Sequence, residues 1–178
     1  MSNLIARKAL IIVDMQNGLF KQAVAPFNNN HVLNNINLLI EKADLSQVPV
    51  IYMRHVGLAH TPLSPESPMT QLISELKKGN HYNILEKQYP NCFRETNLHK
   101  ILTELKVEEL VIVGMKTEYC IDTTVRAATD LGFNVSLISD AHTTFDSEQL
   151  SAQQIIMHHN STLNGAFAKL TTSAEFNF

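Results

Sequence analysis

Three residues with reactive side chains follow short apolar segments that are typical of β-strands. Asp14 closes the apolar run of residues 8–13, while Lys87 and Cys120 each lie just past a later run rich in Ile, Leu or Val. When such strands are parallel members of one sheet, their carboxyl ends share an edge, and ligands bind along that edge. A thiol, a carboxylate and an ammonium group that meet there are suited to nucleophilic catalysis, with the carboxylate as the base for the thiol.

Position along the chain leaves more than one interpretation open for each of these residues. Cys120 falls in the first turn of an expected helix, where N–H groups and partial positive charge favour a thiolate and can hold an oxyanion; most free cysteines are nevertheless buried packing residues. Desolvation raises the pKa of a carboxyl group and would suit Asp14 to act as a base, whereas many aspartates after a strand only cap a turn. Lys87 either pairs with Asp14, lowers the thiol pKa or binds a substrate oxygen, or it is simply solvated.

The elements that would position these residues alternate between strands and helices. Apolar runs predict strands, and apolar residues at helical spacing predict helices. The expected strands are residues 8–13, 48–52, 82–86, 110–113, 133–139 and 167–171, and the expected helices are residues 31–45, 69–76, 96–105, 119–131 and 147–158. This alternation predicts an α/β fold, a three-layer α/β/α sandwich with a mainly parallel, Rossmann-like sheet of roughly six strands. We expect one domain over residues 1–178, with a functional loop in the Pro-rich segment after the second strand.

Composition and motifs argue against several classes of protein. The net charge is −3 and the 14 Lys and Arg residues are scattered, so neither nucleic acid nor a membrane surface is an expected partner. No G-x-G-x-x-G or P-loop motif suggests a nucleotide-dependent enzyme. The cysteines Cys92 and Cys120 cannot form a disulfide framework and lack zinc-site spacing. A free thiol persists in a reducing compartment, so we expect a cytoplasmic location.

Three segments, in order and spanning nearly the whole chain, carry a family resemblance. They are ALIIVDMQNGLF, LEKQYPNCFRETNL and VIVGMKTEYCIDTTVRAATDLGFNVSLISDAHTTFD. Together they resemble the isochorismatase-like cysteine hydrolase family, which includes nicotinamidases and related amidases, and the third segment is the most specific. The run TEYCIDTTVRAA within it is most similar to the streptothricin-hydrolase-like or uncharacterised branch.

The resemblance implies a catalytic triad and a reaction. By the family pattern, Asp14 is the acid/base, Lys87 the catalytic lysine and Cys120 the nucleophile. The pattern also implies a cis peptide bond between Met115 and Lys116, with the backbone N–H groups of Lys116 and Cys120 as the oxyanion hole. The implied activity is hydrolysis of a carbon–nitrogen, amide-type bond of a small molecule through a thioester. The alternatives are an isochorismatase-type ether hydrolase, whose members commonly lack the cysteine, and a catalytically silent binding protein of the same fold. Relatives usually assemble, so a homodimer or homotetramer is expected.

The segment after the second strand departs from the metal-dependent members of that family. Those members carry an Asp-x-His pair there, whereas the stretch YMRHVG places Met53 at the acid's position and leaves only His55. A thioether is a poor ligand for hard or borderline ions. We therefore expect no metal and no other cofactor, and nicotinamide is a doubtful substrate.

Six residues are expected to contact the small-molecule substrate: Phe20, Arg54, His55, Phe93, Tyr119 and His142. Arg54 and His55 follow the second strand and would meet an anionic or polar group, unless they form an exposed basic pair. His142 follows the fifth strand, where bonding to local backbone is the alternative. Tyr119 either lines the pocket or merely begins the helix, and Cys92 is expected to be a small packing residue.

Overall fold

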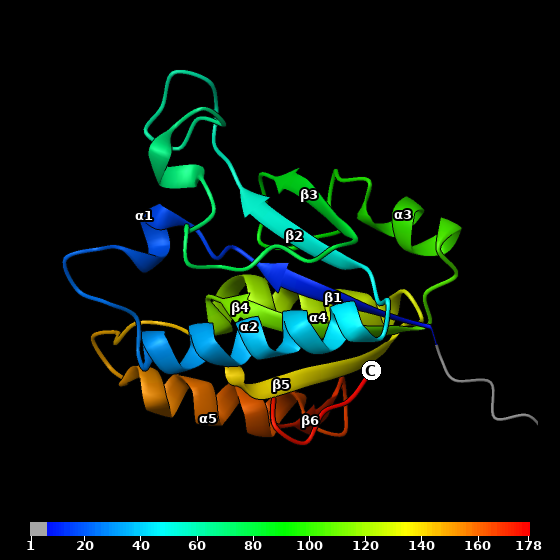
Figure 1. Cartoon of the computed structure of the whole chain (residues 1–178). Coiled ribbons are helices and arrows are strands. Elements are labelled where there is room, and N and C mark those ends of the chain that lie inside the picture. Colours follow the sequence, from blue (N-terminus) through cyan, green and yellow to red (C-terminus); the bar gives the residue numbers. More distant parts are fainter. Residues whose placement is uncertain (1–6) are drawn as a thin grey trace, which may run out of the picture.

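A six-stranded parallel sheet forms the centre of the molecule (Figure 1). The computed structural model describes residues 7–178, so the start of the expected domain, residues 1–6, lies outside the described residues. The strands run in the order β3–β2–β1–β4–β5–β6 and every neighbouring pair is parallel. Their bounds are β1 Lys8–Val13, β2 Val50–His55, β3 Tyr82–Lys87, β4 Glu109–Met115, β5 Asn134–Thr143 and β6 Lys169–Thr171.

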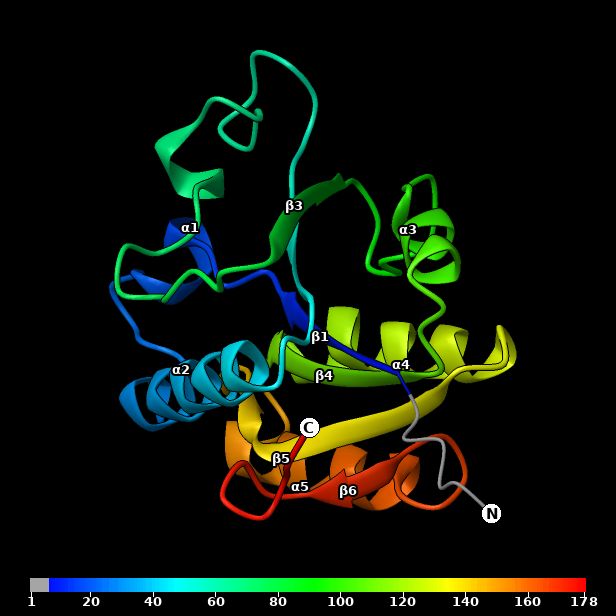
Figure 2. The same cartoon turned by 45° about the vertical axis from the view of Figure 1, so that its right-hand side comes forward.

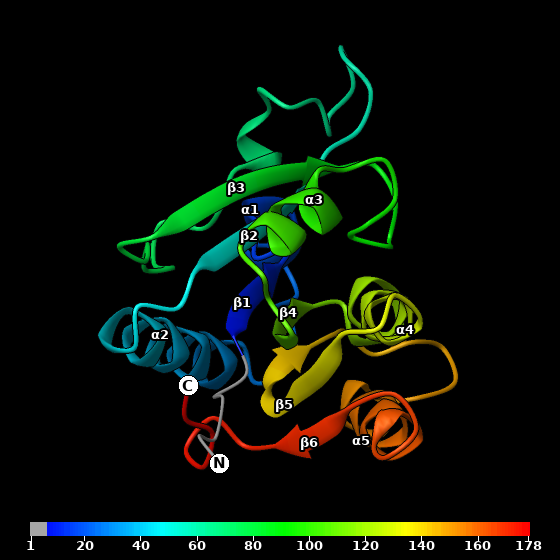
Figure 3. The ribbon, with the colours of Figure 1, turned by 90° about the vertical axis from the view of Figure 1, so that its right-hand side faces the viewer.

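Helices cover both faces of this sheet, as Figures 2 and 3 show from two further directions. The helices are α1 Asn17–Phe20, α2 Asn29–Leu45, α3 Leu98–Glu104, α4 Asp122–Asp130 and α5 Ala152–Leu163, with a 3₁₀ turn at Pro68–Thr70 and a π-helical turn at Thr117–Ile121. Helix α2 packs on one face of the sheet, and α3 and α4 pack on the other. The three-layer α/β architecture expected from the sequence is therefore confirmed. No helix within the described residues is long and apolar enough to cross a membrane.

Strand β1 explains why the sheet is buried on both sides. Leu10 and Ile12 pack into the cluster beneath α2, whereas Ala9, Ile11 and Val13 pack into the cluster beneath α3 and α4. A strand that faces helices on both sides needs apolar residues at every position, not at alternate ones. The continuous apolar run before Asp14 follows from this requirement, and it brings the aspartate to the carboxyl edge of the sheet.

The prediction of a helix over residues 69–76 is wrong. After the 3₁₀ turn at Pro68–Thr70, the chain bonds to the segment between β1 and α1: Asn17 N donates to Gln71 O over 2.9 Å, and Ile73 N donates to Met15 O over 3.1 Å. These bonds engage backbone groups that a helix would have used internally, while Ile73 is still buried in the core. The helical spacing of the apolar residues in this segment reflects burial of an irregular chain, not a helix.

Three other boundaries differ from the expected ones in ways that matter for the site. Strand β2 continues to His55, so Arg54 and His55 belong to the strand. Helix α4 begins at Asp122, because the π-helical turn takes up the residues around Cys120. Helix α5 begins at Ala152, where Ser151 and Gln154 form a capping box, and so it starts five residues later than expected.

Gly114 allows β1 and β4 to approach each other beside the site. It pairs with Val13 in the sheet and has a φ of +119°, which glycine adopts readily. A Cβ atom at this position would lie 2.1 Å from Val13 O. Gly132 also has a positive φ, of +90°, but nothing lies within 4 Å of its Cβ position.

Replacement of these two glycines by alanine should therefore differ in cost. Gly114→Ala is expected to lower the free energy of unfolding by about 3 kcal/mol or more, because β1 and β4 must move apart. Gly132→Ala should cost only about 1–2 kcal/mol, the usual penalty of a left-handed conformation. Urea denaturation of both variants measures the difference, and equal losses would contradict the tight approach of β1 and β4.

Candidate active site

The carboxyl edge of the sheet brings Asp14, Lys87 and Cys120 together. Asp14 follows β1, Lys87 ends β3, and Cys120 lies in the π-helical turn after β4. The Lys87 Nζ atom is 2.8 Å from Asp14 Oδ2 and 3.2 Å from Cys120 Sγ. All three residues are buried, with 1%, 2% and 8% of Asp14, Lys87 and Cys120 exposed. The structure thus assembles an acid, a cation and a thiol within hydrogen-bonding range.

The Lys87 ammonium is the centre of this group. Besides Asp14 and Cys120, it contacts His55 Nδ1 at 3.1 Å and donates to the backbone carbonyl of Tyr89 at 3.2 Å. Burial is the largest single influence and by itself lowers the pKa of Lys87, but the Asp14 carboxylate together with the Cys92 and Cys120 sulfurs outweighs it, and the net pKa is raised. Lys87 is therefore an ammonium ion, and its partners satisfy a charge that would otherwise be costly to bury.

One carboxylate oxygen of Asp14 has no hydrogen-bond partner among the described residues. Asp14 Oδ2 accepts from Lys87, whereas Oδ1 is buried and has no hydrogen-bond partner among residues 7–178. The residue has a φ of +52°, and its backbone N–H donates to Met53 O, so the carboxylate is held by β2 as well as by β1. A buried acceptor without a partner is rare in folded proteins, and it marks the place where a proton can be received.

Cys120 is protonated in the resting site. Burial first and the Asp14 carboxylate second raise the pKa of its thiol to about 12, while Lys87 acts in the opposite direction. The effect of a helix N-terminus, expected from the sequence to favour a thiolate, is outweighed because Cys120 lies in a buried π-helical turn ahead of α4. The thiol must lose its proton to a neighbour before it can attack.

A cavity of about 300 Å³ opens above these groups. It is lined by Asp14, Gln16, Gly18, Leu19, His55, Leu63, Met69, Pro90, Lys116, Tyr119 and Cys120. Cys120 and Asp14 supply the reactive atoms, and the remaining walls are largely apolar. The volume suits a small molecule of the size bound in typical ligand pockets.

Of the expected substrate contacts, the structure places His55 and Tyr119 on the cavity. Lys116 also lines it, and the peptide bond between Met115 and Lys116 is cis. This peptide leads from β4 into the π-helical turn that holds Cys120.

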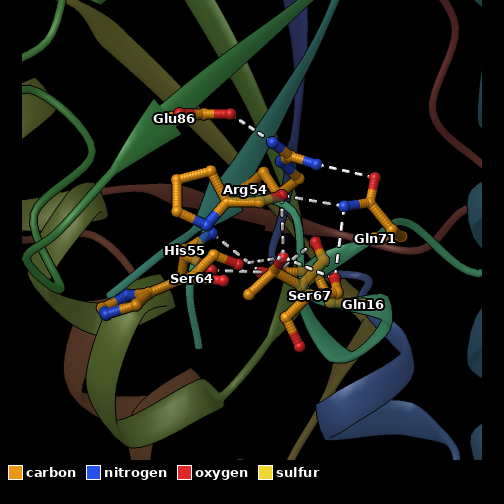
Figure 4. A network of polar contacts seen from close by, with 9 residues as sticks. Gln16, Arg54, His55, Ser64, Ser67, Gln71 and Glu86 are labelled. Atoms are coloured by element: carbon orange, nitrogen blue, oxygen red, sulfur yellow. Dashed lines mark hydrogen bonds and ion pairs between the residues drawn. The ribbon is translucent and has the colours of Figure 1, made fainter. Parts of the chain in front are cut away.

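The other four expected contacts do not line this cavity. Phe20 is buried in the core beneath α2, and Phe93 packs against Phe133 with their rings 6.0 Å apart. The Arg54 side chain lies between Glu86 and Gln71, to which it is bonded (Figure 4). His142 is buried against the π-helical turn at Thr117–Ile121, where its ring nitrogens contact Thr117 Oγ1 at 2.9 Å and Asn160 Oδ1 at 2.8 Å.

Gln16 is a site residue that the sequence analysis missed. Its side-chain amide donates to the backbone carbonyls of His55 and Thr70, and its Oε1 accepts from His55 N at 2.8 Å (Figure 4). It thereby fixes the end of β2 and the Pro-rich segment to β1. Its position two residues after Asp14 was a usable signal. Leu63 and Met69 were also missed individually, although the segment that carries them was expected to be functional.

Asp14, His55 and Cys120 are the described residues that approach the geometry of a metal site, with one donor atom from each lying within 4.8 Å of the others. The Lys87 ammonium is hydrogen-bonded to all three residues. The Lys87 ammonium is thus already bonded to the three residues that a metal ion would need as ligands. Met53 is fully buried in the core and adds no carboxylate to the set.

Comparison of the sequence with known protein families identifies the family of this chain. The isochorismatase domain family matches residues 8–175. The chain belongs to the isochorismatase family. Membership in this family supports a hydrolase as the broad class of activity.

Several relatives within the isochorismatase family match most of the chain. The uncharacterized protein YrdC of Bacillus subtilis is 30% identical, with 94% of this chain and 92% of that protein covered. Nicotinamidase 3 of Arabidopsis thaliana is 28% identical over 89% of this chain and 80% of that protein. Streptothricin hydrolase of Streptomyces noursei is 29% identical, over 78% of this chain and half of that protein. The crystal structure of an isochorismatase from Pseudomonas putida superposes with a TM-score of 0.87 at 29% identity, over 96% and 90% of the two chains.

Alkylation by iodoacetamide should distinguish the two cysteines of the folded protein. Cys120 lines the cavity, whereas Cys92 is fully buried, so only Cys120 should react. With its pKa raised to about 12, the thiolate fraction and hence the rate should rise about tenfold per pH unit from pH 7 to pH 9. Intact-mass spectrometry gives the rate, and denatured protein, in which both thiols label, is the control. A rate that is constant across neutral pH would mean a resting thiolate and would contradict the raised pKa.

His142 should make the folded protein sensitive to acid. Burial lowers its pKa to about 4 from an ordinary value of 6.5, so the unfolded chain binds a proton that the folded chain does not. The free energy of unfolding should therefore fall as the pH drops from about 6.5 to about 4, with a contribution of up to about 3 kcal/mol from this residue. Urea denaturation at several pH values measures the slope. His142→Gln should flatten it, and an unchanged slope would contradict a buried neutral histidine.

Proposed function

We propose that this member of the isochorismatase family hydrolyses the carbon–nitrogen bond of a small amide through a thioester on Cys120. The observation that carries the proposal is the Lys87 ammonium, 2.8 Å from Asp14 Oδ2 and 3.2 Å from Cys120 Sγ beside a cavity of about 300 Å³. This arrangement pairs a nucleophile with a base and a fixed positive charge. The similarity to a nicotinamidase, an amidase by name, supports the choice of an amide over an ether.

Formation of the thioester begins with a proton transfer. Asp14 Oδ1, which has no partner among the described residues, accepts the thiol proton as Cys120 sulfur bonds to the amide carbon. Lys87 stays charged throughout and offsets the negative charge that moves from carboxylate to sulfur. The proton transfer accompanies the attack, because a thiol of pKa about 12 does not supply a standing thiolate at neutral pH.

The tetrahedral intermediate then loses its amine. Its oxyanion accepts hydrogen bonds from the backbone N–H groups of Lys116 and Cys120, which serve as the oxyanion hole in this scheme. Asp14 gives the stored proton to the amide nitrogen, the carbon–nitrogen bond breaks, and an acyl group remains on Cys120. Asp14 is thus returned to its carboxylate form.

Hydrolysis of the thioester reverses these roles. Asp14 takes a proton from a water molecule, and the water oxygen bonds to the acyl carbon. The carbon–sulfur bond breaks, Asp14 returns the proton to the sulfur, and the carboxylic acid product leaves. One water is consumed, and the thiol of Cys120 is restored.

Removal of the nucleophile tests this scheme. Cys120→Ala should lower turnover of an amide substrate by at least about a thousandfold, because the covalent step is lost. The melting temperature should change little, since the side chain borders a cavity. Cys92→Ala is the matched control: it removes the other thiol and should retain turnover.

Intact-mass spectrometry after a brief exposure to substrate gives a second readout. An adduct equal to the acyl group is expected on the wild-type protein and absent from Cys120→Ala. Full activity in Cys120→Ala would rule out the thioester and favour a reaction that needs no thiol, such as ether hydrolysis.

A further inference from the structure

His55 presents one defined hydrogen-bond donor to the cavity. Its Nδ1 lies 3.1 Å from Lys87 Nζ, and an ammonium group can only donate, so Nδ1 must accept. The ring proton is therefore on Nε2. No hydrogen bond joins Nε2 to another residue in 7–178, and the ring lines the cavity, so the Nε2–H group is available to a ligand. Burial first and the Lys87 charge second lower the pKa of His55, which keeps the ring neutral.

Each formal charge around the cavity is already balanced. Asp14 and Lys87 form a buried ion pair at 2.8 Å. Lys116 Nζ lies 4.0 Å from Glu118 Oε1 and 4.5 Å from the centre of the Tyr119 ring. A charged substrate would have to give up its hydration without gaining a free counter-charge, which is unfavourable in a partly enclosed site.

The guanidinium of Arg54, the strongest candidate for anion binding, bonds to other side chains of the protein. Arg54 precedes His55 in β2, but its guanidinium pairs with Glu86 and donates to Gln71 Oε1 at 2.7 Å. Figure 4 shows this side chain held between those two partners. The buried Nε atom of Arg54 has no hydrogen-bond partner among the described residues, but Arg54 is absent from the cavity lining and so does not meet a carboxylate or phosphate there.

Apolar side chains form the wall that faces these polar groups. Leu19 comes from α1, Leu63 and Met69 from the segment between β2 and β3, and Pro90 from the segment after β3. Such a wall gains free energy by covering the hydrocarbon part of a ligand. Besides the reacting atoms, the polar side-chain groups on the cavity include the Lys116 ammonium, the Tyr119 hydroxyl and the Nε2–H group of His55. Of these three groups, the His55 donor is the one whose ring is fixed by a contact with Lys87.

We propose that the site selects an uncharged amide, and that His55, held by Lys87 as the Nε2–H tautomer, donates a hydrogen bond to an acceptor atom outside the reacting amide. This inference rests on the proposed amide hydrolysis, whose substrate class it names. His55 contacts the substrate as a specificity-determining residue in this scheme and does not exchange protons.

Nitrogen-15 NMR of the wild-type protein tests the tautomer without any substrate. At pH 7.5, the two-bond proton–nitrogen correlations of His55 should show a protonated Nε2 and an unprotonated Nδ1. A His55→Gln sample identifies the signals by their loss. An Nδ1–H tautomer or an imidazolium ion at this pH overturns the proposal.

Calorimetry on a protein that cannot form the thioester tests the recognition. In Cys120→Ala, tetrahydrofuran-2-carboxamide should bind about fivefold to tenfold more tightly than cyclopentanecarboxamide, which has the same shape but lacks the ether oxygen; this ratio corresponds to one hydrogen bond. Adding His55→Leu should abolish the difference, whereas adding His55→Gln, which keeps a donor near the position of Nε2, should preserve part of it. Succinamide should likewise bind at least about tenfold more tightly than the anion succinamate.

Two outcomes of this binding experiment overturn the proposal. The first is equal affinity for the two ring amides, or no measurable binding of the ether amide. The second is preferential binding of succinamate. Neither depends on turnover, so a failure here is distinguishable from failure of the thioester mechanism, which is judged by activity and by the acyl adduct. Thermal unfolding of each variant shows whether a loss of binding reflects a loss of fold.

Discussion

The buried ion pair between Lys87 and Asp14 is the interaction on which the site depends. Its partners are 73 residues apart in sequence and lie on β3 and β1, which are separated in the sheet by β2. An ion pair this far from water is stable only when both groups are held in position and further hydrogen bonds satisfy them. The sheet supplies the first condition, and His55, Tyr89 and Cys120 supply the second.

The same ion pair influences the protonation of its neighbours Cys120 and His55. Burial first and the Asp14 carboxylate second raise the pKa of the Cys120 thiol, whereas the Lys87 ammonium lowers it. The ammonium also determines which ring nitrogen of His55 carries the proton. The ion pair thus fixes the tautomer of an imidazole and acts on the pKa of a thiol through both of its charges.

The sequence predicted the parallel sheet well, because strands buried on both faces must be apolar at every position. β1 is the clearest case: its bounds agree with the expectation, and Asp14 falls at the predicted edge. The position of Cys120 after the buried β4 follows from the same logic, whereas Lys87 lies on β3, an edge strand that is largely exposed. Only the distances, which depend on strand order and register, required the structure.

The parts that could not be predicted depend on contacts between distant segments. Residues 69–76 have the spacing of a helix, but their backbone bonds go to the region around Met15 and Asn17. Arg54 was expected to face substrate, yet Glu86 on the adjacent strand and Gln71 hold it. His142 lies at the expected edge, but its ring contacts Thr117 of the π-helical turn and Asn160 of α5. Local sequence does not record which partner a polar group will find.

The position of Lys87 on β3 has a consequence for how the protein loses its function. Within residues 7–178, β3 is the outermost strand on its side of the sheet and pairs with β2 alone, and its residues Tyr82 and Ile84 are substantially exposed. Edge elements with few buried contacts separate from a domain at a lower free energy than its central strands do. Detachment of β3 would carry the ammonium away from Asp14 while β1, β4 and β5 stayed paired. The assembled site is therefore a less stable unit than the fold that carries it.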